Sequence, residues 1–181
     1  FGRIDILVHN TGGPAPGTFF EHDDAAWGEA GDLLLYSAIR LYRLVCPIMK
    51  TNRWGRIVNV TSVTVKEPLE NLVLSNVYRA GIVSLAKTIS RELAEDNILI
   101  NTVCPGYYLT ERMQEVLGNQ AQRSGRDLED VVRSLAAEIP VGRMGDPDEL
   151  ANLVAFLSSD TASNITGTTV AADGGLLKNI L

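Results

Sequence analysis

Short apolar runs alternate with longer segments whose apolar residues recur at intervals of three and four positions. The short runs predict buried strands at Ile4–Val8, Arg56–Val60, Ile98–Val103 and Thr168–Ala172. The longer segments predict helices at 24–50, 75–96, 111–117 and 127–138, with a further one beginning after Asp146. Strands that alternate with helices favour an α/β fold with a parallel sheet covered on both faces.

The predicted helix 24–50 is apolar on two sides. One set of apolar residues includes Trp27, Leu34 and Val45, and a second set is Leu33, Tyr36, Ile39 and Tyr42. Such a helix is expected to be buried on both sides, with one side against the sheet and the other against a partner subunit.

The stretch from Ser75 to Thr110 predicts a helix, a tight turn, a buried strand and a loop. Asp96-Asn97 is a plausible helix end because asparagine tolerates the left-handed conformation, and Pro105-Gly106 ends the strand. Ligands of open α/β sheets bind beyond the carboxyl ends of the strands, so this loop is where we expect a site.

Residues 111–138 are otherwise polar and predict two short helices, 111–117 and 127–138, broken by Gly118 and Gly125. We interpret them as a lid. Asp146, Pro147 and Glu149 form a well-defined helix start, with an N-cap, a proline at the first position and an acidic residue at the third.

Composition narrows the function classes. A length of 181 residues suits one domain, and the formal net charge of -6 with a pI of about 4.9 argues against nucleic acid and anionic membrane as partners. No apolar run approaches the roughly 18 residues of a membrane span. The two cysteines, Cys46 and Cys104, fit no metal spacing and suggest a reducing, cytoplasmic compartment, so no metal site is expected.

Six motifs resemble the short-chain dehydrogenase/reductase superfamily, in particular its 3-oxoacyl-[acyl-carrier-protein] reductase branch. They are IDILVHNTGG at 4–13, GRIVNVTS at 55–62, RAGIVSLAKTISRELA at 79–94, INTVCPGYYLT at 100–110, PVGRMGDPDELA at 140–151 and TGTTVAADGG at 166–175. The resemblance implies a Rossmann-like, doubly wound parallel sheet, present as its C-terminal half of about four strands. It also implies hydride transfer between NAD or NADP and a small keto or hydroxy substrate, and a homodimer or homotetramer formed through helices 24–50 and 75–96.

The resemblance also assigns cofactor residues. Asn10 and Gly12 match the family's Asn-Asn-Ala-Gly turn beneath the adenosine ribose. Pro105, Gly106 and Thr110 match its Pro-Gly-x-x-x-Thr loop, which holds the nicotinamide carboxamide.

The four catalytic positions of the family are altered. The family uses Ser, Tyr, a Lys four residues after the Tyr, and an Asn relay, and these fall on Ser62, Ser75, Arg79 and Leu34. A serine hydroxyl donates a hydrogen bond but lacks the acidity of a phenol. Arginine does not deprotonate, although its fork of donors can grip ribose hydroxyls. The site is therefore either decayed or re-tuned for another substrate or reaction.

Other side chains could supply the missing proton. Tyr78 follows Ser75 by three residues and is the preferred substitute, while Tyr107 and Tyr108 lie in the loop after Pro105-Gly106. His9, at the end of the first strand, is expected to be structural.

The first strand, Ile4–Val8, matches the fourth strand of the family, and no glycine-rich pyrophosphate turn precedes it. We expect a preceding segment that this sequence does not include. Three hypotheses remain: an active oxidoreductase, a catalytically degenerate member that binds a ligand or serves as a partner subunit, and a scaffold that binds no dinucleotide.

Overall fold

The computed structural model describes residues 2–180 and contains one parallel sheet of four strands. They are β1 (Ile6–Asn10), β2 (Gly55–Val60), β3 (Ile98–Pro105) and β4 (Thr169–Ala172), hydrogen-bonded in the order β1-β2-β3-β4. In register, His9 pairs with Asn59, and Asn59 with Thr102. The predicted α/β fold is confirmed, and because all strands run in one direction their carboxyl ends meet at one edge.

The predicted helix 24–50 is continuous but not α-helical throughout. It consists of α1 (Asp24–Gly31), a π-helical segment (Asp32–Tyr36) and α2 (Ser37–Asn52), which runs through Pro47. Periodicity did not predict the π-helical segment. Such segments are rare and occur often at functional sites.

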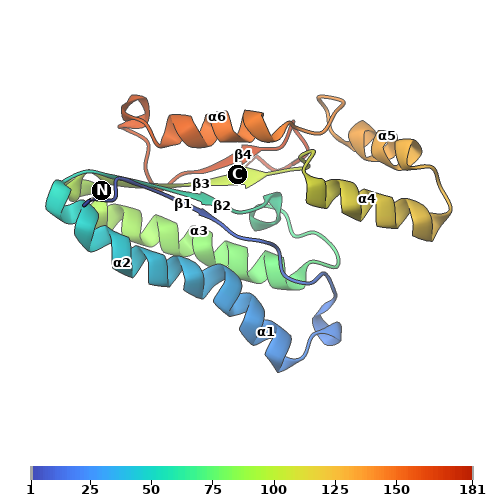
Figure 1. Ribbon diagram of the computed structural model, residues 1–181, viewed down its shortest axis with the longest axis horizontal. Coiled ribbons are helices and arrows are strands. Elements are labelled where there is room, and N and C mark those ends of the chain that lie inside the picture. The colour runs from blue at the N-terminus through green and yellow to red at the C-terminus, as the bar shows by residue number, and fades with distance from the viewer. Residues whose placement is uncertain (1, 181) are drawn as a thin grey trace.

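Helices cover both faces of the sheet (Figure 1). On one face α2 and α3 (Val73–Leu93) pack against the strands around Met49, Ile57 and Ile82, which are fully buried. On the other face lies α6 (Pro147–Leu157), whose Leu157 packs with Val58 and Val103. Tyr42, from the second apolar set, is 3% exposed, and its hydroxyl donates to Asn59 of β2.

Two predicted helix ends are confirmed. A short 3-10 turn, Ala94–Asp96, follows α3 and closes on Asn97, which has φ 58°. The start of α6 is a capping box: the Asp146 side chain accepts from the backbone of the first turn, and Glu149 accepts from the Asp146 N–H.

The predicted lid is longer than expected at its first helix. Gly118 does not break it, because α4 runs over Glu111–Ser124 and ends at Gly125, which has φ 66°. It packs on α5 (Leu128–Glu138) around a small core that contains Leu117, Val131 and Met144. Figure 1 shows the α4–α5 pair projecting from the carboxyl edge of the sheet.

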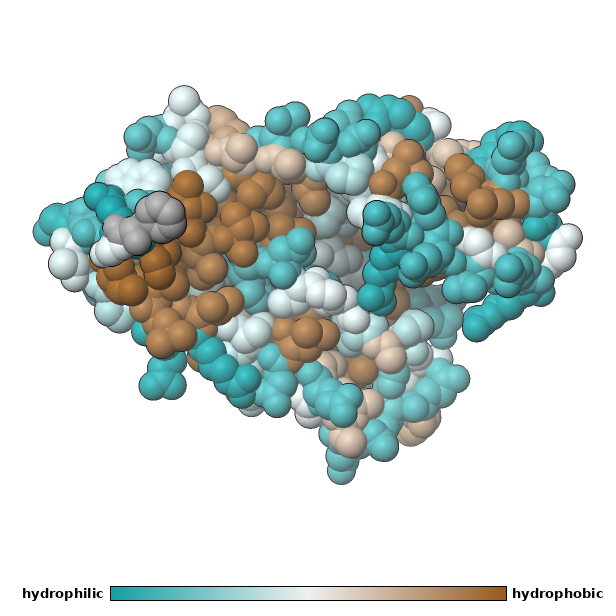
Figure 2. Space-filling model, viewed as in Figure 1, coloured by the Kyte–Doolittle hydropathy of each residue, from teal (hydrophilic) through white to brown (hydrophobic). Residues whose placement is uncertain are grey.

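One edge of the sheet is apolar and exposed. β1 has a strand neighbour on one side only within residues 2–180, and Ile4, Ile6 and Val8 are 38%, 48% and 44% exposed. Figure 2 shows hydrophobic surface gathered on the face where β1 lies. Within residues 2–180, no helix is both long and apolar enough to cross a bilayer, and no three acidic, histidine or cysteine residues group as metal ligands would.

Candidate active site

Arg79 joins the carboxyl ends of β1 and β2. Its side chain, which is 7% exposed, extends from α3 and donates four hydrogen bonds. Nη1 donates to the carbonyls of Val60 and Thr61 at 3.3 and 3.1 Å, and Nη2 donates to the carbonyl of Gly12 at 3.3 Å. Nε donates to the Ser75 hydroxyl oxygen at 3.2 Å. One residue therefore fixes the loop after β1 against the end of β2.

The charge of Arg79 is buried without an acidic partner. Among the described residues, no carboxylate lies within ion-pair distance of it. Burial lowers the pKa of Arg79, although its ordinary value is so high that the guanidinium stays charged. A buried cation that only carbonyl and hydroxyl oxygens surround stabilises negative charge that develops nearby.

Ser75 and Ser62 both keep a hydroxyl proton to donate. The Ser75 oxygen accepts from Arg79 Nε, and the residue is 7% exposed. The Ser62 oxygen accepts from the Thr64 N–H at 3.2 Å, where it caps a 3-10 turn, Val63–Val65. Leu34, at the family's relay position, is fully buried and offers no polar side chain.

Two of the predicted cofactor residues, Asn10 and Thr110, border an open cavity. A cavity of about 470 Å³ is lined by Asn10, Val60 and Thr110 together with apolar residues of α6. A side chain added at Gly12 would meet no atom within 4 Å, so a ligand can approach the backbone there. Asn10 is exposed. These features fit a nucleotide whose ribose and carboxamide need polar partners, with Arg79 at the end of the same strands.

The loop that carries Gly106 and Thr110 is fixed at several points. Gly106 N–H donates to the Ala172 carbonyl at 3.0 Å, and the Tyr108 hydroxyl donates to the same carbonyl at 3.0 Å. A side chain at Gly106 would lie 2.9 Å from Asp173, so only glycine fits without a shift. Thr110 accepts from the Met113 N–H and so caps α4. The hydroxyl proton of Thr110 stays free to donate.

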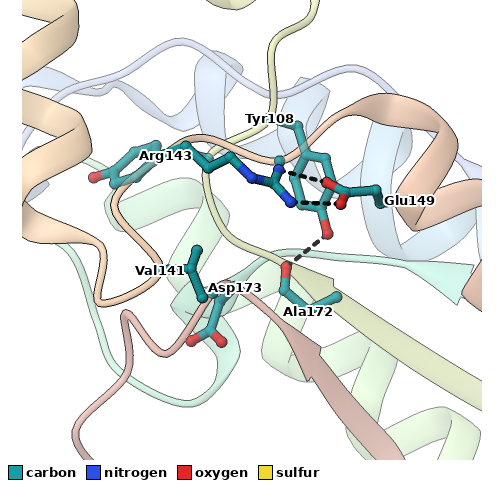
Figure 3. A pocket seen from close by; sticks show the side chains of 9 residues that line it. Tyr108, Val141, Arg143, Glu149, Ala172 and Asp173 are labelled. Carbon is teal, nitrogen blue, oxygen red and sulfur yellow. Dashed lines mark hydrogen bonds and ion pairs between the residues drawn. The ribbon is translucent and has the colours of Figure 1, made fainter.

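An ion pair between Arg143 and Glu149 holds the stretch of chain that faces this loop. Figure 3 shows Arg143 bound to Glu149 through two ion-paired hydrogen bonds, 2.8 and 2.7 Å long, beside Tyr108 and Ala172. The cavity drawn there, of about 270 Å³, is lined by none of Ser62, Ser75 or Arg79. The Arg143–Glu149 pair therefore lies outside the group formed by Ser62, Ser75 and Arg79. Its role was not predicted, although the motif at 140–151 contains both residues.

Glu149→Gln is expected to lower the melting temperature slightly at pH 7. The hydrogen bonds from Arg143 and from the Asp146 backbone hold the pKa of Glu149 at about 2, well below its ordinary 4.5. The stabilisation is thus complete above pH 4.5 and is lost as the pH falls towards 2. Thermal melts from pH 7 to pH 2 should show the difference from wild type shrink across that range. The matched variant Glu115→Gln, on an exposed face of α4, should show no such trend.

A further cavity is lined by Val63, the residue that follows Ser62. Its volume is about 370 Å³, and its lining combines Val63, Leu69, Tyr107 and Leu176 with the charged residues Glu67, Glu138 and Lys178. Burial, and then the Glu138 carboxylate, raise the pKa of Tyr107. The volume suits a small molecule, and its position next to Ser62 suits a substrate.

The Tyr78 side chain points away from Ser62, Ser75 and Arg79. Its hydroxyl donates to the Trp27 carbonyl at 2.8 Å, and its ring packs on Trp27 with centroids 5.9 Å apart. A side chain at Gly31 would meet the Tyr78 ring at 3.1 Å, so Tyr78 fills the interface between α1 and α3. The predicted role as proton donor gains no support from this placement, because the Tyr78 hydroxyl is committed to the Trp27 carbonyl in the packing of α1 on α3.

Tyr78→Phe is accordingly expected to leave turnover within about twofold of wild type. It should reduce the free energy of unfolding by about 0.5–1.5 kcal/mol, the usual loss for one hydrogen bond. Denaturant melts and steady-state rates measure the two effects, with Tyr36→Phe, an exposed tyrosine, as the matched variant. A loss of turnover greater than tenfold would return Tyr78 to the proton-donor role.

The structure therefore brings together most of the predicted site. Arg79 contacts Ser75 and Gly12 directly, and Val60 links it to the cavity that Asn10 and Thr110 share. Ser62 follows Thr61, whose carbonyl accepts from Arg79. Pro105 ends β3 at the same edge, whereas Tyr78 lies outside this set.

Comparisons with known proteins identify the family and the fold. A family model described as enoyl-(acyl carrier protein) reductase matches residues 1–177. An NADPH-dependent reductase, BacG, from Bacillus subtilis is 33% identical over 179 residues, which are 99% of this chain and 69% of the relative. The 3-oxoacyl-[acyl-carrier-protein] reductase FabG of Vibrio cholerae is 34% identical over 178 residues, 97% of this chain and 68% of the relative. The solved L-sorbose reductase of Gluconobacter frateurii, in complex with NADPH and L-sorbose, superposes with a TM-score of 0.95 at 33% identity. That superposition covers 99% of this chain and 69% of the reductase.

Proposed function

The chain belongs to the short-chain dehydrogenase/reductase family, and on that basis we propose that it transfers hydride between NAD(P) and a small keto or hydroxy compound, with Ser62, Ser75 and Arg79 as its altered catalytic set. The single observation that carries the proposal is the direct hydrogen bond from the buried Arg79 guanidinium to Ser75. A decayed site would not be expected to keep a buried cation that is bonded to the residue at the family's tyrosine position.

The nicotinamide would supply or accept the hydride. Pro105, Gly106 and Thr110 would hold its carboxamide, and Asn10 and Gly12 would lie beneath the adenosine ribose of the same cofactor. The NADPH named for two of the relatives favours NADP. Arg79 would contribute its remaining Nη2 hydrogen to a ribose hydroxyl, because its other four N–H groups are already bonded.

The protein side chains would act on the substrate oxygen. Ser62 donates a hydrogen bond to the carbonyl, and Ser75 gives that oxygen its proton when the carbon receives the hydride. Because Arg79 donates to the Ser75 oxygen, negative charge that develops on the serine is stabilised in place. Arg79 therefore takes over part of what a phenol would do through its own acidity.

The cavity beside Ser62 favours a compact substrate. Its volume of about 370 Å³ is near the lower end for ligand sites, so we propose a free small molecule that lies between Val63 and Tyr107. The α4–α5 pair at residues 111–138 would act as the lid, since Tyr107 packs against its core and Glu138 lines the same cavity.

The proposal is tested by oxidation of NADPH and of NADH at 340 nm with a panel of small ketones, keto esters and sugars. The reverse reaction is followed with the matching alcohols. Turnover that Ser75→Ala lowers by about 100-fold would support the proposed function. Cofactor binding without turnover across the whole panel would instead identify a non-catalytic ligand-binding member, and absence of cofactor binding would refute both.

Three further features stay predictions. Assembly as a homodimer or homotetramer is supported by a groove of about 470 Å³ between α2 and α3, lined by Cys46, Pro47 and Ile89 among others, and light scattering measures it. A single domain over residues 1–181 should unfold in one cooperative transition, which thermal melts measure. A cytoplasmic location fits two cysteines that are free thiols, and fractionation of cells tests it.

A further inference from the structure

His9 is buried at the carboxyl end of β1, with one ring nitrogen bonded and the other open. Its side chain is 2% exposed, and Nε2 lies 3.0 Å from the Ser37 hydroxyl oxygen. Nδ1 has no hydrogen-bond partner among the described residues. A buried polar atom without a partner is uncommon, and it points to a role beyond packing.

The surroundings of Ser37 set the tautomer of His9. The Ser37 hydroxyl donates to the Leu33 carbonyl at 2.6 Å, with the Leu34 carbonyl next at 3.0 Å. Its single proton is thus committed to the π-helical segment, and the oxygen can only accept from His9. Nε2 therefore carries the proton of the neutral ring, and Nδ1 presents a lone pair.

Arg79 is the charged neighbour of His9. Burial, and then the positive charge of Arg79, lower the pKa of His9 below its ordinary 6.5. From the other elements packed around His9, Ser37 faces it from the start of α2, and Asn59 pairs with it from β2. Tyr42 lies beyond Asn59, to which it donates a hydrogen bond. The environment of His9 therefore favours the neutral ring more than water does, and the Nδ1 lone pair is buried and unpartnered with the charge of Arg79 nearby.

The altered catalytic set leaves a need that this ring can meet. Arg79 cannot release a proton, Ser75 alone is too weak an acid or base, and Leu34 has replaced the polar relay. Burial raises the pKa of Tyr42, Cys104 and Tyr107, which removes these groups from the neutral range. Of the groups at this edge of β1 and β2, His9 has the ordinary titration range nearest to neutrality.

We propose that His9 is the positioning residue that accepts the active-site proton on its buried Nδ1, acting on the substrate by way of Ser75. This role rests on the proposed function. It replaces the purely structural role that the sequence suggested, and the Ser37 contact that fixes the ring was not predicted.

Atoms and charges balance in the oxidising direction. The substrate O–H bond breaks, its proton moves to the Ser75 oxygen, and the Ser75 proton leaves through a water molecule to His9 Nδ1. The hydride leaves the substrate carbon for the oxidised cofactor, so the products are a ketone, a reduced cofactor and one imidazolium. The imidazolium loses this proton before the next turnover, and because His9 is 2% exposed that release requires water to reach the ring. Reduction is the reverse sequence and begins with a protonated His9.

The test uses the whole chain and the best alcohol substrate of the panel, with kcat/KM measured from pH 5 to pH 9. For wild type we expect a tenfold rise per pH unit up to an ionisation below pH 6.5, and then a plateau. His9→Asn, which still donates to Ser37 but does not titrate, should lower the plateau by about 100-fold and abolish the rise. The chain's other histidine provides the matched control, because His22→Asn should behave as wild type.

Two results would overturn the role of His9. One is a His9→Asn variant that keeps the wild-type plateau within threefold, or keeps the ionisation. The other is an imidazole that does not change protonation between pH 4.5 and pH 8, as read by NMR of histidine-labelled protein with NADP+ bound. His22→Asn assigns the two resonances. Absence of turnover by wild type counts against the proposed function, and the NMR titration then decides the question for His9 by itself.

Discussion

Arg79→Ala is expected to weaken nicotinamide affinity by at least about tenfold and to lower kcat/KM further. The change removes hydrogen bonds to Ser75, Gly12 and the end of β2, together with the cation that faces the cleft. A tenfold loss of affinity corresponds to about 1.4 kcal/mol, which is within the range for one hydrogen bond to a charged group. Cofactor affinity is measured by quenching of the intrinsic tryptophan fluorescence.

The controls for Arg79 separate charge from shape. Arg79→Lys keeps a cation with three donors and should retain most of the affinity, since the family has lysine at this position. Arg91→Ala, at an exposed position on the same helix, should bind as wild type. Equal affinity of Arg79→Ala and wild type would contradict the assigned role and leave Arg79 as a structural tie between β1 and β2.

Ser75→Ala is expected to lower kcat by about 100-fold while cofactor affinity changes little. The serine hydroxyl is the group next to Arg79 that can give a proton to the substrate oxygen, and general acid catalysis is worth about 10²–10⁴-fold. Because the hydrogen bond to Arg79 Nε is not itself a cofactor contact, the loss should fall on kcat and not on the dissociation constant.

A double-mutant cycle tests whether Ser75 and Arg79 act together. If the guanidinium stabilises charge on the serine, the double variant should be little slower than the worse single variant, since each change already removes the shared effect. Ser84→Ala, at an exposed position on α3, is the matched control. Strict additivity of the two losses, or a Ser75→Ala variant with wild-type kcat, would contradict the proposed chemistry.

The sequence predicted the sheet because each strand is a compact apolar run between turn residues. Asn97 and Asp146 marked helix ends through local chemistry that tertiary contacts do not override. The register of the family motif placed Ser75 and Arg79 four residues apart on one helix face, and the structure joins them by a hydrogen bond. The helical repeat that predicted α3 therefore also places Ser75 and Arg79 in contact.

Other features could not be predicted from spacing. Tyr78 differs from Arg79 by one position, and only the packing of α1 on α3 decides that its hydroxyl meets Trp27. Gly118 stays helical because the α4–α5 core outweighs its weak propensity, which is about 1 kcal/mol. The contact of His9 with Ser37 joins residues 28 apart, and it depends on a helix irregularity that has no signature in the sequence.

The π-helical segment Asp32–Tyr36 sets how far α1 is rotated about the helix axis relative to α2. Each residue of an α-helix turns the chain by about 100°, so the extra residue of the Asp32–Tyr36 segment rotates α1 by about that much relative to α2. Deletion of a single residue within the segment would make α1 and α2 one regular α-helix, and it would move Trp27 away from Tyr78. It would also release the carbonyls that hold Ser37. One peptide unit thus sets both the packing of α1 on α3 and the acceptor role of the Ser37 oxygen toward His9.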